Sequence, residues 1–171
     1  MAEQIAANAV LPSPAWNSAA GICDVRPSAS AADAEQGLHR ALIIERVHRY
    51  GWALDEKRDD LLADCFSPGG IWEGTVMGGP MIGPVIGRDE IVSWLSGLSV
   101  DQDDQRRHSF SNLVVEFLSP TTAVAHAYVL LLISRDSSMT AQTSGPYRFE
   151  LGGTDGVWRI DRLTAGFDAP F

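Results

Sequence analysis

The sequence predicts an α+β fold in which helices come first and a curved antiparallel sheet folds over them. Apolar residues recur at helical spacing between residues 33 and 66, and a further helical segment follows at 88–98. Most of the remaining chain has the pattern of strands separated by turn signals. Helices followed by a run of strands are typical of α+β domains.

The composition indicates one globular domain preceded by an arm. The chain has 171 residues, of which 45% are apolar and 20% charged, and this suits a single domain with a sizeable core. Residues 1–33 are rich in Ala, Ser and Pro and have no sustained period, so we expect a flexible arm that can lie on a neighbouring subunit. Residues 34–171 form the predicted domain.

Three helices are predicted within the first hundred residues. The first begins after Asp33, whose side chain suits an N-cap, and ends near Asp55. Its apolar residues, at spacings of three and four, are Leu38, Ala41, Leu42, Val47, Gly51 and Leu54. A second helix covers 58–66 and ends at the sequence SPGG. The third covers 88–98 and carries acidic residues near its N-terminus.

Five strands are predicted, at 70–76, 107–118, 121–135, 142–153 and 156–167. The glycine-rich segment 77–87 is predicted to be a loop that forms a lid beside a pocket, and it lacks the spacing of a phosphate-binding loop. Strand 121–135 is apolar on both faces. We expect one face in the core and the other covered in a homodimer or homotrimer; the residues expected on that outer face are Val129, Leu131 and Ile133.

Charge and composition exclude several classes of partner. The formal net charge of -9 and the lack of basic clusters argue against nucleic acid and against anionic membrane surfaces. The two cysteines are far apart, too few for a disulfide framework, and no His or Cys spacing supports a metal. The N-terminus does not resemble a secretory signal, and no apolar run approaches the roughly 18 residues of a membrane span. We therefore expect a cytoplasmic protein.

Asp55 occupies the apolar side of the first helix, four residues after Gly51. Either it is a solvated helix breaker, or it points inward, where a carboxylate needs a nearby donor. His108 is the candidate donor, because it stands at the start of strand 107–118 with polar neighbours. An imidazole held by a carboxylate suits proton abstraction near neutral pH.

Five segments then occur in a particular order: ALDEKRDDLLADCFSPGGIWEG, GRDEIVSWL, RRHSFSNLVVEF, TTAVAHAYVLLL and DGVWRIDRL. Together they resemble the SnoaL-like, scytalone-dehydratase-like branch of the nuclear-transport-factor-like superfamily over residues 38–168. The resemblance implies a cone-shaped α+β barrel, in which three helices close a strongly bent mixed sheet around a deep apolar pocket. It also implies that Asp55 supports His108, and that His108 removes a proton during elimination.

The chain departs from scytalone dehydratase itself. That enzyme has a second pocket histidine and a tyrosine just before the aspartate, whereas the matching positions here fall near Ile133 or Ser134 and at Leu54. The one-histidine dyad of dehydrochlorinase-like members fits better. Its acid or electrophile must come from another residue.

Several further residues are candidates for the pocket. Tyr50 either polarises a substrate carbonyl or packs within the helix layer, and Asn112 either donates to an oxyanion or satisfies the backbone at a strand bend. His126 is either a second pocket histidine or a core or outer-face residue. Arg148 either holds an anionic group or lies on the surface. The remaining candidates for lining the pocket are Trp52, Trp72, Trp94, Phe110 and Tyr128.

We expect a lyase or isomerase that needs no cofactor and acts on a small hydrophobic, aromatic or polycyclic molecule. Dehydration, dehydrohalogenation, double-bond shift and the aldol-type closure of polyketide cyclases all begin with removal of a proton. Two alternatives belong to other classes: a noncatalytic small-molecule-binding or assembly module, and an accessory subunit resembling the small subunit of ring-hydroxylating dioxygenases. A binding module predicts no short contact between Asp55 and His108.

Overall fold

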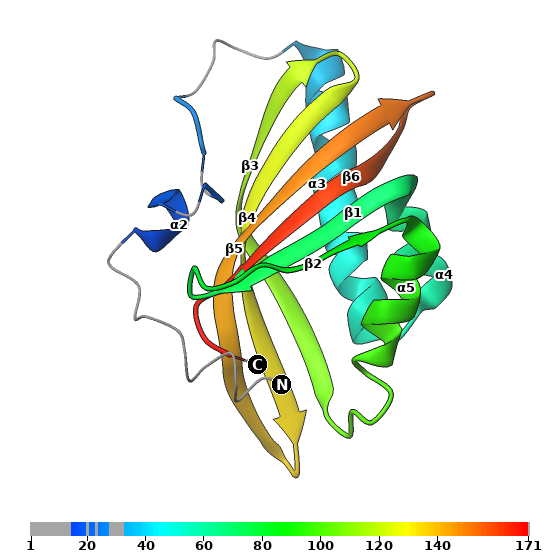
Figure 1. The fold of residues 1–171 in the computed structure, drawn as a ribbon. Helices are drawn as coiled ribbons and strands as arrows, with labels where there is room; N and C mark the ends of the chain where they lie inside the picture. The colour runs from blue at the N-terminus through cyan, green and yellow to red at the C-terminus, as the bar shows by residue number, and fades with distance from the viewer. Residues whose placement is uncertain (1–14, 20, 23, 28–32, 171) are drawn as a thin grey trace.

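Six strands form one mixed sheet in the computed structural model, which describes residues 15–19, 21–22, 24–27 and 33–170 (Figure 1). The strand order is β2-β1-β6-β5-β4-β3. β1 and β6 run parallel, and every other neighbouring pair is antiparallel. The strands are β1 (Phe66–Val76), β2 (Ile82–Ile86), β3 (Gln105–Ser119), β4 (Thr122–Arg135), β5 (Ser138–Thr154) and β6 (Val157–Phe167).

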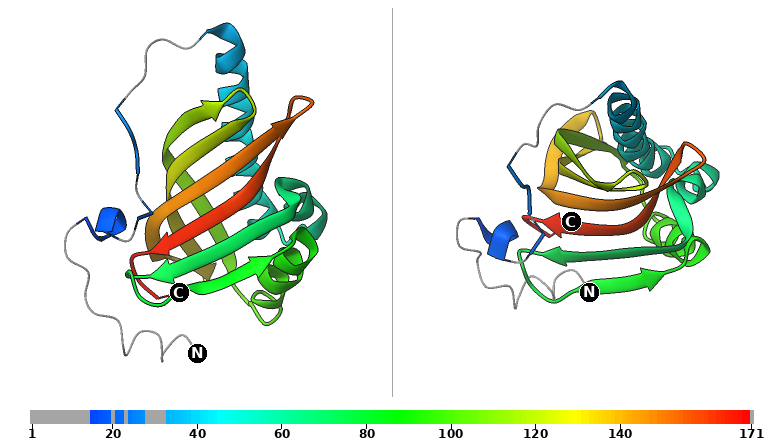
Figure 2. Two further views of the ribbon diagram at one scale, coloured as in Figure 1. Left: turned by 45° about the horizontal axis from the view of Figure 1, so that its top comes forward. Right: turned by 90° about the horizontal axis from the view of Figure 1, so that it is seen from above.

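Three helices cover one side of this sheet, and the predicted α+β class with its curved sheet is confirmed. They are α3 (Ala34–Asp55), α4 (Asp59–Cys65) and α5 (Arg88–Gly97). Figure 2 shows the sheet curling around α3, with α4 and α5 beside the β1 and β2 end. A short helix, α2 (Trp16–Ala19), lies on the other side of the sheet (Figure 1).

Helix α3 fills the concave side of the sheet because its buried residues face small and aromatic side chains. Asp33 caps the helix as predicted, and its carboxylate accepts a hydrogen bond from the backbone N–H of Gln36 at 2.8 Å. The buried residues of the helix are Ile43, Val47, Tyr50, Gly51 and Ala53. On β4, the buried side chains of Ala123, Ala125 and Ala127 belong to the same core. These alanines leave room for a helix to lie close to the strands.

Two sequence predictions about faces differ from the structure, the first in part. On α3, Val47 and Gly51 are buried as predicted, whereas Leu38 and Ala41 are exposed. The buried side of the helix also includes Ile43 and Tyr50, which were not predicted. On β4, Val129 and Leu131 are buried on the inner face, whereas Tyr128 and Leu130 are exposed. Because side chains alternate along a strand, an error of one residue exchanges the two faces.

The segment 77–87 is not wholly a loop. Its second half forms β2, which pairs with β1 through Ile82, Val85 and Ile86. β2 lies at the edge of the sheet and has only β1 as a neighbour. An edge strand tolerates Gly83 and Pro84. Proline has no backbone N–H, and on the outer side of an edge strand this group would have no neighbouring strand to pair with. This segment contributes no residue to the pocket described below.

The predicted flexible arm, residues 1–33, lies largely outside the described residues. The described part touches its own chain. Trp16 donates its indole N–H to Asp168 at 3.0 Å, and the backbone N–H of Arg26 donates to Glu116 at 3.0 Å. Ile22 is buried. None of the helices in the described part of the chain is both long and apolar enough to cross a membrane.

Candidate functional site

Asp55 and His108 meet where the C-terminal end of α3 approaches the start of β3. The Oδ1 atom of Asp55 lies 2.6 Å from Nδ1 of His108, and Oδ2 accepts the backbone N–H of His108 at 2.9 Å. The side chains are 7% and 13% exposed. A carboxylate with two donors from one residue holds both the strand and the ring in place.

The hydrogen bond at Nδ1 decides what the other ring nitrogen can do. When the ring is neutral, the proton on Nδ1 is donated to the carboxylate, and Nε2 then carries a lone pair. His108 lines the pocket. The arrangement can therefore accept a proton from a bound molecule, and Asp55 stabilises the imidazolium that forms.

Gly51 allows this contact. It lies one turn before Asp55, and a Cβ atom at this position would lie 3.1 Å from the ring of Phe110 and 3.4 Å from Cβ of His108. α3 thus passes closer to β3 than a larger residue would permit. The amide of Gln105 adds a hydrogen bond to the Asp55 carbonyl at 3.0 Å.

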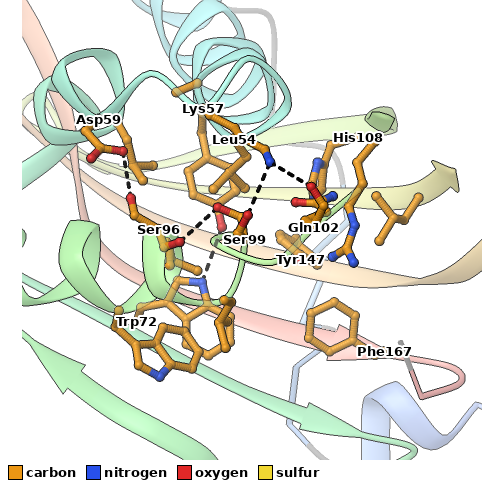
Figure 3. Close-up of a pocket in the computed structure, with 18 residues that line it drawn as sticks. Leu54, Lys57, Asp59, Trp72, Ser96, Ser99, Gln102, His108, Tyr147 and Phe167 are labelled. Carbon is orange, nitrogen blue, oxygen red and sulfur yellow. Dashed lines mark hydrogen bonds between the residues drawn. The ribbon is translucent and has the colours of Figure 1, made fainter. Parts of the chain in front are cut away.

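The pocket beside His108 is lined mainly by apolar and aromatic side chains from α3, α4, α5 and four strands (Figure 3). Its cavity is about 100 Å³. An engineered cavity of about 150 Å³ accommodates benzene. Because the cavity here is smaller than that, even a single ring must extend through the rim or displace part of it. The apolar lining residues are Tyr50, Ala53, Leu54, Leu62, Trp72, Trp94, Leu95, Leu98, Leu131, Tyr147 and Phe167.

Charged and polar residues form the rim. The ammonium of Lys57 donates to the carbonyls of Ser99 and Gln102 at 3.2 and 3.3 Å, and this ties the end of α3 to the segment that follows α5 (Figure 3). Arg106 donates from Nε to Asp104 at 3.2 Å. Both cations are thus engaged by oxygen atoms of the rim.

Tyr50 and Trp72 line the pocket, whereas Phe110, which the sequence analysis expected to line it, is not among the lining residues. The phenol oxygen of Tyr50 accepts the indole N–H of Trp72 at 3.3 Å. Burial raises the pKa of Tyr50 above its ordinary range, so the phenol stays protonated. Trp94 lines the pocket and stacks at a tilt on Trp72, with ring centroids 4.6 Å apart. Phe110 packs beneath the lining against Tyr50, with ring centroids 6.3 Å apart.

Trp52 and Tyr128 lie outside the pocket. Trp52 is 65% exposed, because it sits on the side of α3 that faces away from the sheet. Tyr128 is 46% exposed on the outer face of β4.

Asn112, His126 and Arg148 also lie outside it. Asn112 is exposed and has a φ of 52° where the pairing of β3 with β4 shifts, which matches the strand-bend alternative. His126 is buried on the outer face, 3.6 Å from Glu116, and Arg148 forms an ion pair with Glu150. Among the described residues, no group of three or more His, Cys, Asp or Glu could hold a metal ion.

Several lining residues were not predicted. Lys57 and Arg106 belong to turn and strand-end segments, where charged residues are common on any surface. Tyr147 alternates with Phe149 on β5, and this spacing could have indicated that it faces inward.

The comparisons with known proteins agree with this architecture. The family model of the SnoaL-like domain matches residues 36–164. A structure from Catenulispora acidiphila in complex with S-DNPA is 30% identical, with a TM-score of 0.64, and the match covers 74% of this chain and 91% of that one. A search of the curated proteins found no match.

Two more distant structures share the fold. LinA is 21% identical, with a TM-score of 0.66, over 80% of this chain and 92% of that one. The beta subunit of a putative aromatic-ring-hydroxylating dioxygenase from Novosphingobium aromaticivorans is 13% identical, with a TM-score of 0.69, over 80% and 93% of the two chains.

Proposed function

Given that the chain belongs to the SnoaL-like family, we propose that it is a cofactor-independent lyase or isomerase that removes a carbon-bound proton from a small hydrophobic molecule. One observation carries the proposal. Nδ1 of His108 lies 2.6 Å from a buried carboxylate, while the ring lines an apolar pocket. Such a pairing leaves Nε2 as the base.

The roles of the two residues follow from their contacts. His108 takes the proton through Nε2, and Asp55 holds the ring and stabilises the positive charge that the ring gains. The apolar walls exclude water, and charge interactions inside such a site are stronger than in solution. A positioned general base contributes about 100- to 10,000-fold to the rate.

The similar Catenulispora acidiphila structure supports a small organic substrate, because it holds S-DNPA. The cavity of about 100 Å³ and its mainly apolar lining favour a small molecule whose apolar part enters the pocket. The remainder of a larger molecule would lie at the rim, near Lys57 and Arg106.

The experiment that tests the proposal is a screen in heavy water. Cyclic and aromatic compounds with an acidic C–H bond or a leaving group are incubated with the protein. Mass spectrometry then follows deuterium uptake, loss of water or halide, and isomerisation. We expect turnover of at least one compound class, and His108→Ala should slow it by about 100- to 10,000-fold. Asp55→Asn should cause a smaller loss.

His48→Ala is the matched control, since His48 is an exposed histidine on α3, the helix that ends at Asp55. It should leave turnover unchanged. Equal turnover in wild type and His108→Ala would contradict the proposal. Tight binding of small molecules with no His108-dependent chemistry would indicate a noncatalytic binding module.

A further inference from the structure

Arg106 lies two residues before His108 on β3 and lines the same pocket. Side chains two residues apart on a strand leave the same face, and their Cα atoms are roughly 6.5 Å apart, so one small molecule can contact both. The Arg106 side chain is 30% exposed. Because a guanidinium does not lose its proton in proteins, a permanent positive charge lies close to His108.

The guanidinium of Arg106 is held at one corner. Its Nε donates to Oδ1 of Asp104 at 3.2 Å, and this is the one hydrogen bond from the side chain to the described residues. The Asp104 side chain is 5% exposed and also accepts the amide of Gln102 at 2.6 Å, which anchors it. The two terminal nitrogens of Arg106 carry four further N–H donors. Donors arranged in this way match the two oxygens of a carboxylate.

Lys57 adds a second positive charge at the rim. Its ammonium donates to the carbonyls of Ser99 and Gln102, and since both acceptors are uncharged, they hold the ammonium without neutralising it (Figure 3). The backbone of Lys57 has a φ of 51°, the left-handed conformation for which glycine is usual after a helix. A lysine in place of glycine favours a role for its side chain.

The charge of the rim is opposite to that of the chain. The formal net charge of -9 repels anions in general. Among the pocket-lining residues, however, Lys57 and Arg106 are cationic, and the one acidic residue, Asp59, already accepts the hydroxyl of Ser96 at 2.6 Å. Behind this rim the lining is mainly apolar. Such a site suits a molecule with an apolar part and an anionic end.

We propose that the substrate is a carboxylic acid whose carboxylate binds at the rim to the terminal nitrogens of Arg106 and to Lys57, while its apolar part enters the pocket beside His108. This inference rests on the proposed function and names the class of substrate. The carboxylate orients the carbon whose proton His108 removes, and it takes no part in bond making or breaking. A neutral molecule of the same shape gains no charge-assisted hydrogen bond and binds less tightly.

The test compares acids with amides of the same shape. Phenylacetate, 3-phenylpropanoate and 4-phenylbutanoate are titrated into the full chain by calorimetry, each beside its uncharged amide. We expect at least one acid to bind more tightly than its amide. Arg106→Gln should weaken binding of that acid about 10- to 100-fold, because it removes hydrogen bonds to a charged group. Binding of the amide should not change.

Arg107→Gln is the matched control. Arg107 is the next residue of β3, and its side chain is 48% exposed and pairs with Glu56. The variant therefore loses the same charge on the opposite face of the strand, and it should bind the acid like wild type. Equal losses in the two glutamine variants, or no preference of wild type for any acid over its amide, would overturn the inference.

Arg106→Lys keeps the result decisive if Arg106→Gln does not fold. Lysine retains the charge but lacks the planar fork of donors, so this variant should still bind the acid more weakly than wild type. Unchanged affinity would contradict the role of Arg106. The proposed function fails in a different experiment, by unchanged turnover in His108→Ala. Acid binding that depends on Arg106, without turnover that depends on His108, would remove the proposed reaction and leave the carboxylate site.

Discussion

Both carboxylate oxygens of Asp55 serve one residue, because one contacts the His108 ring and the other the His108 backbone. This contact could be predicted from the sequence, since an aspartate on the buried side of a helix needs a donor. The exposure of Trp52 was also predictable in principle, because Trp52 lies nine residues after the buried Ile43 and thus about 180° around the helix from it. Tyr147 packs against three aromatic rings at the pocket, and sequence spacing does not give their arrangement.

His126 makes stability depend on pH. Burial lowers its pKa, and Arg148 lowers it further, while Glu116 and Asp24 oppose this. The unfolded chain therefore binds a proton at His126 more readily than the folded protein does, with an unfolded pKa of about 6.5. The neutral His126 side chain therefore contributes to the free energy of unfolding above about pH 6.5. This contribution is lost as the pH falls from the pKa of the unfolded chain through the lower pKa of the folded protein.

We therefore expect His126→Gln to lose less free energy of unfolding than wild type between about pH 7 and pH 5. Urea denaturation at a series of pH values measures the free energy of unfolding of both proteins. His48→Gln, which replaces an exposed histidine, should behave like wild type. An identical pH dependence in wild type and His126→Gln would show that burial of His126 has no such effect.

At the level of elements, α3 must approach β3 closely while remaining a regular helix. Long elements were predictable because many residues repeat their period. β2 was not, since Gly83 and Pro84 interrupt a strand of five residues and resemble loop signals. What stabilises β2 is its pairing with β1, a long-range contact that local sequence does not reveal.

Two glycines of α3 provide a matched pair of variants. A Cβ at Gly37 meets nothing within 4 Å, so Gly37→Ala should stabilise the protein by about 0.5–1 kcal/mol through helix propensity. Gly51→Ala adds the same methyl group 3.1 Å from Phe110, and overpacking costs about 1–3 kcal/mol. Gly51→Ala should therefore be less stable than Gly37→Ala by at least about 1 kcal/mol.

Urea denaturation of the two variants measures this difference, and turnover measures its consequence. Gly51→Ala should also slow proton removal, because it moves the end of α3 away from His108. If both variants gain the same stability and keep full turnover, the close approach of α3 to β3 is not what positions the site.

At the scale of the whole molecule, the outer face of the sheet carries apolar residues that nothing in the described chain covers fully. Tyr128 is 46% exposed and Leu130 41%, and Val114 lies nearby on β3. The sequence predicted an uncovered face but assigned it to the wrong residues of β4. The overall α+β order could be predicted from the succession of periods, whereas the curl that forms the pocket depends on contacts between distant elements.

We predict that this outer face forms a homodimer or homotrimer interface. Leu130→Lys should then reduce the mass measured by light scattering to that of one chain. Met139→Lys, at an exposed position near the start of β5, is the control and should keep the assembly. A wild-type mass equal to one chain at micromolar concentration would refute the prediction.

In the proposed reaction, Asp55 presents Nε2 of His108 to the pocket as a base. The most direct measurement is the tautomer of His108 by ¹⁵N NMR at a pH where the ring is neutral, with His108→Ala to assign the signals. We expect the proton on Nδ1 in the wild type, and we expect this preference to weaken in Asp55→Asn. A proton on Nε2 in the wild-type protein would contradict it, because no lone pair would then face the substrate.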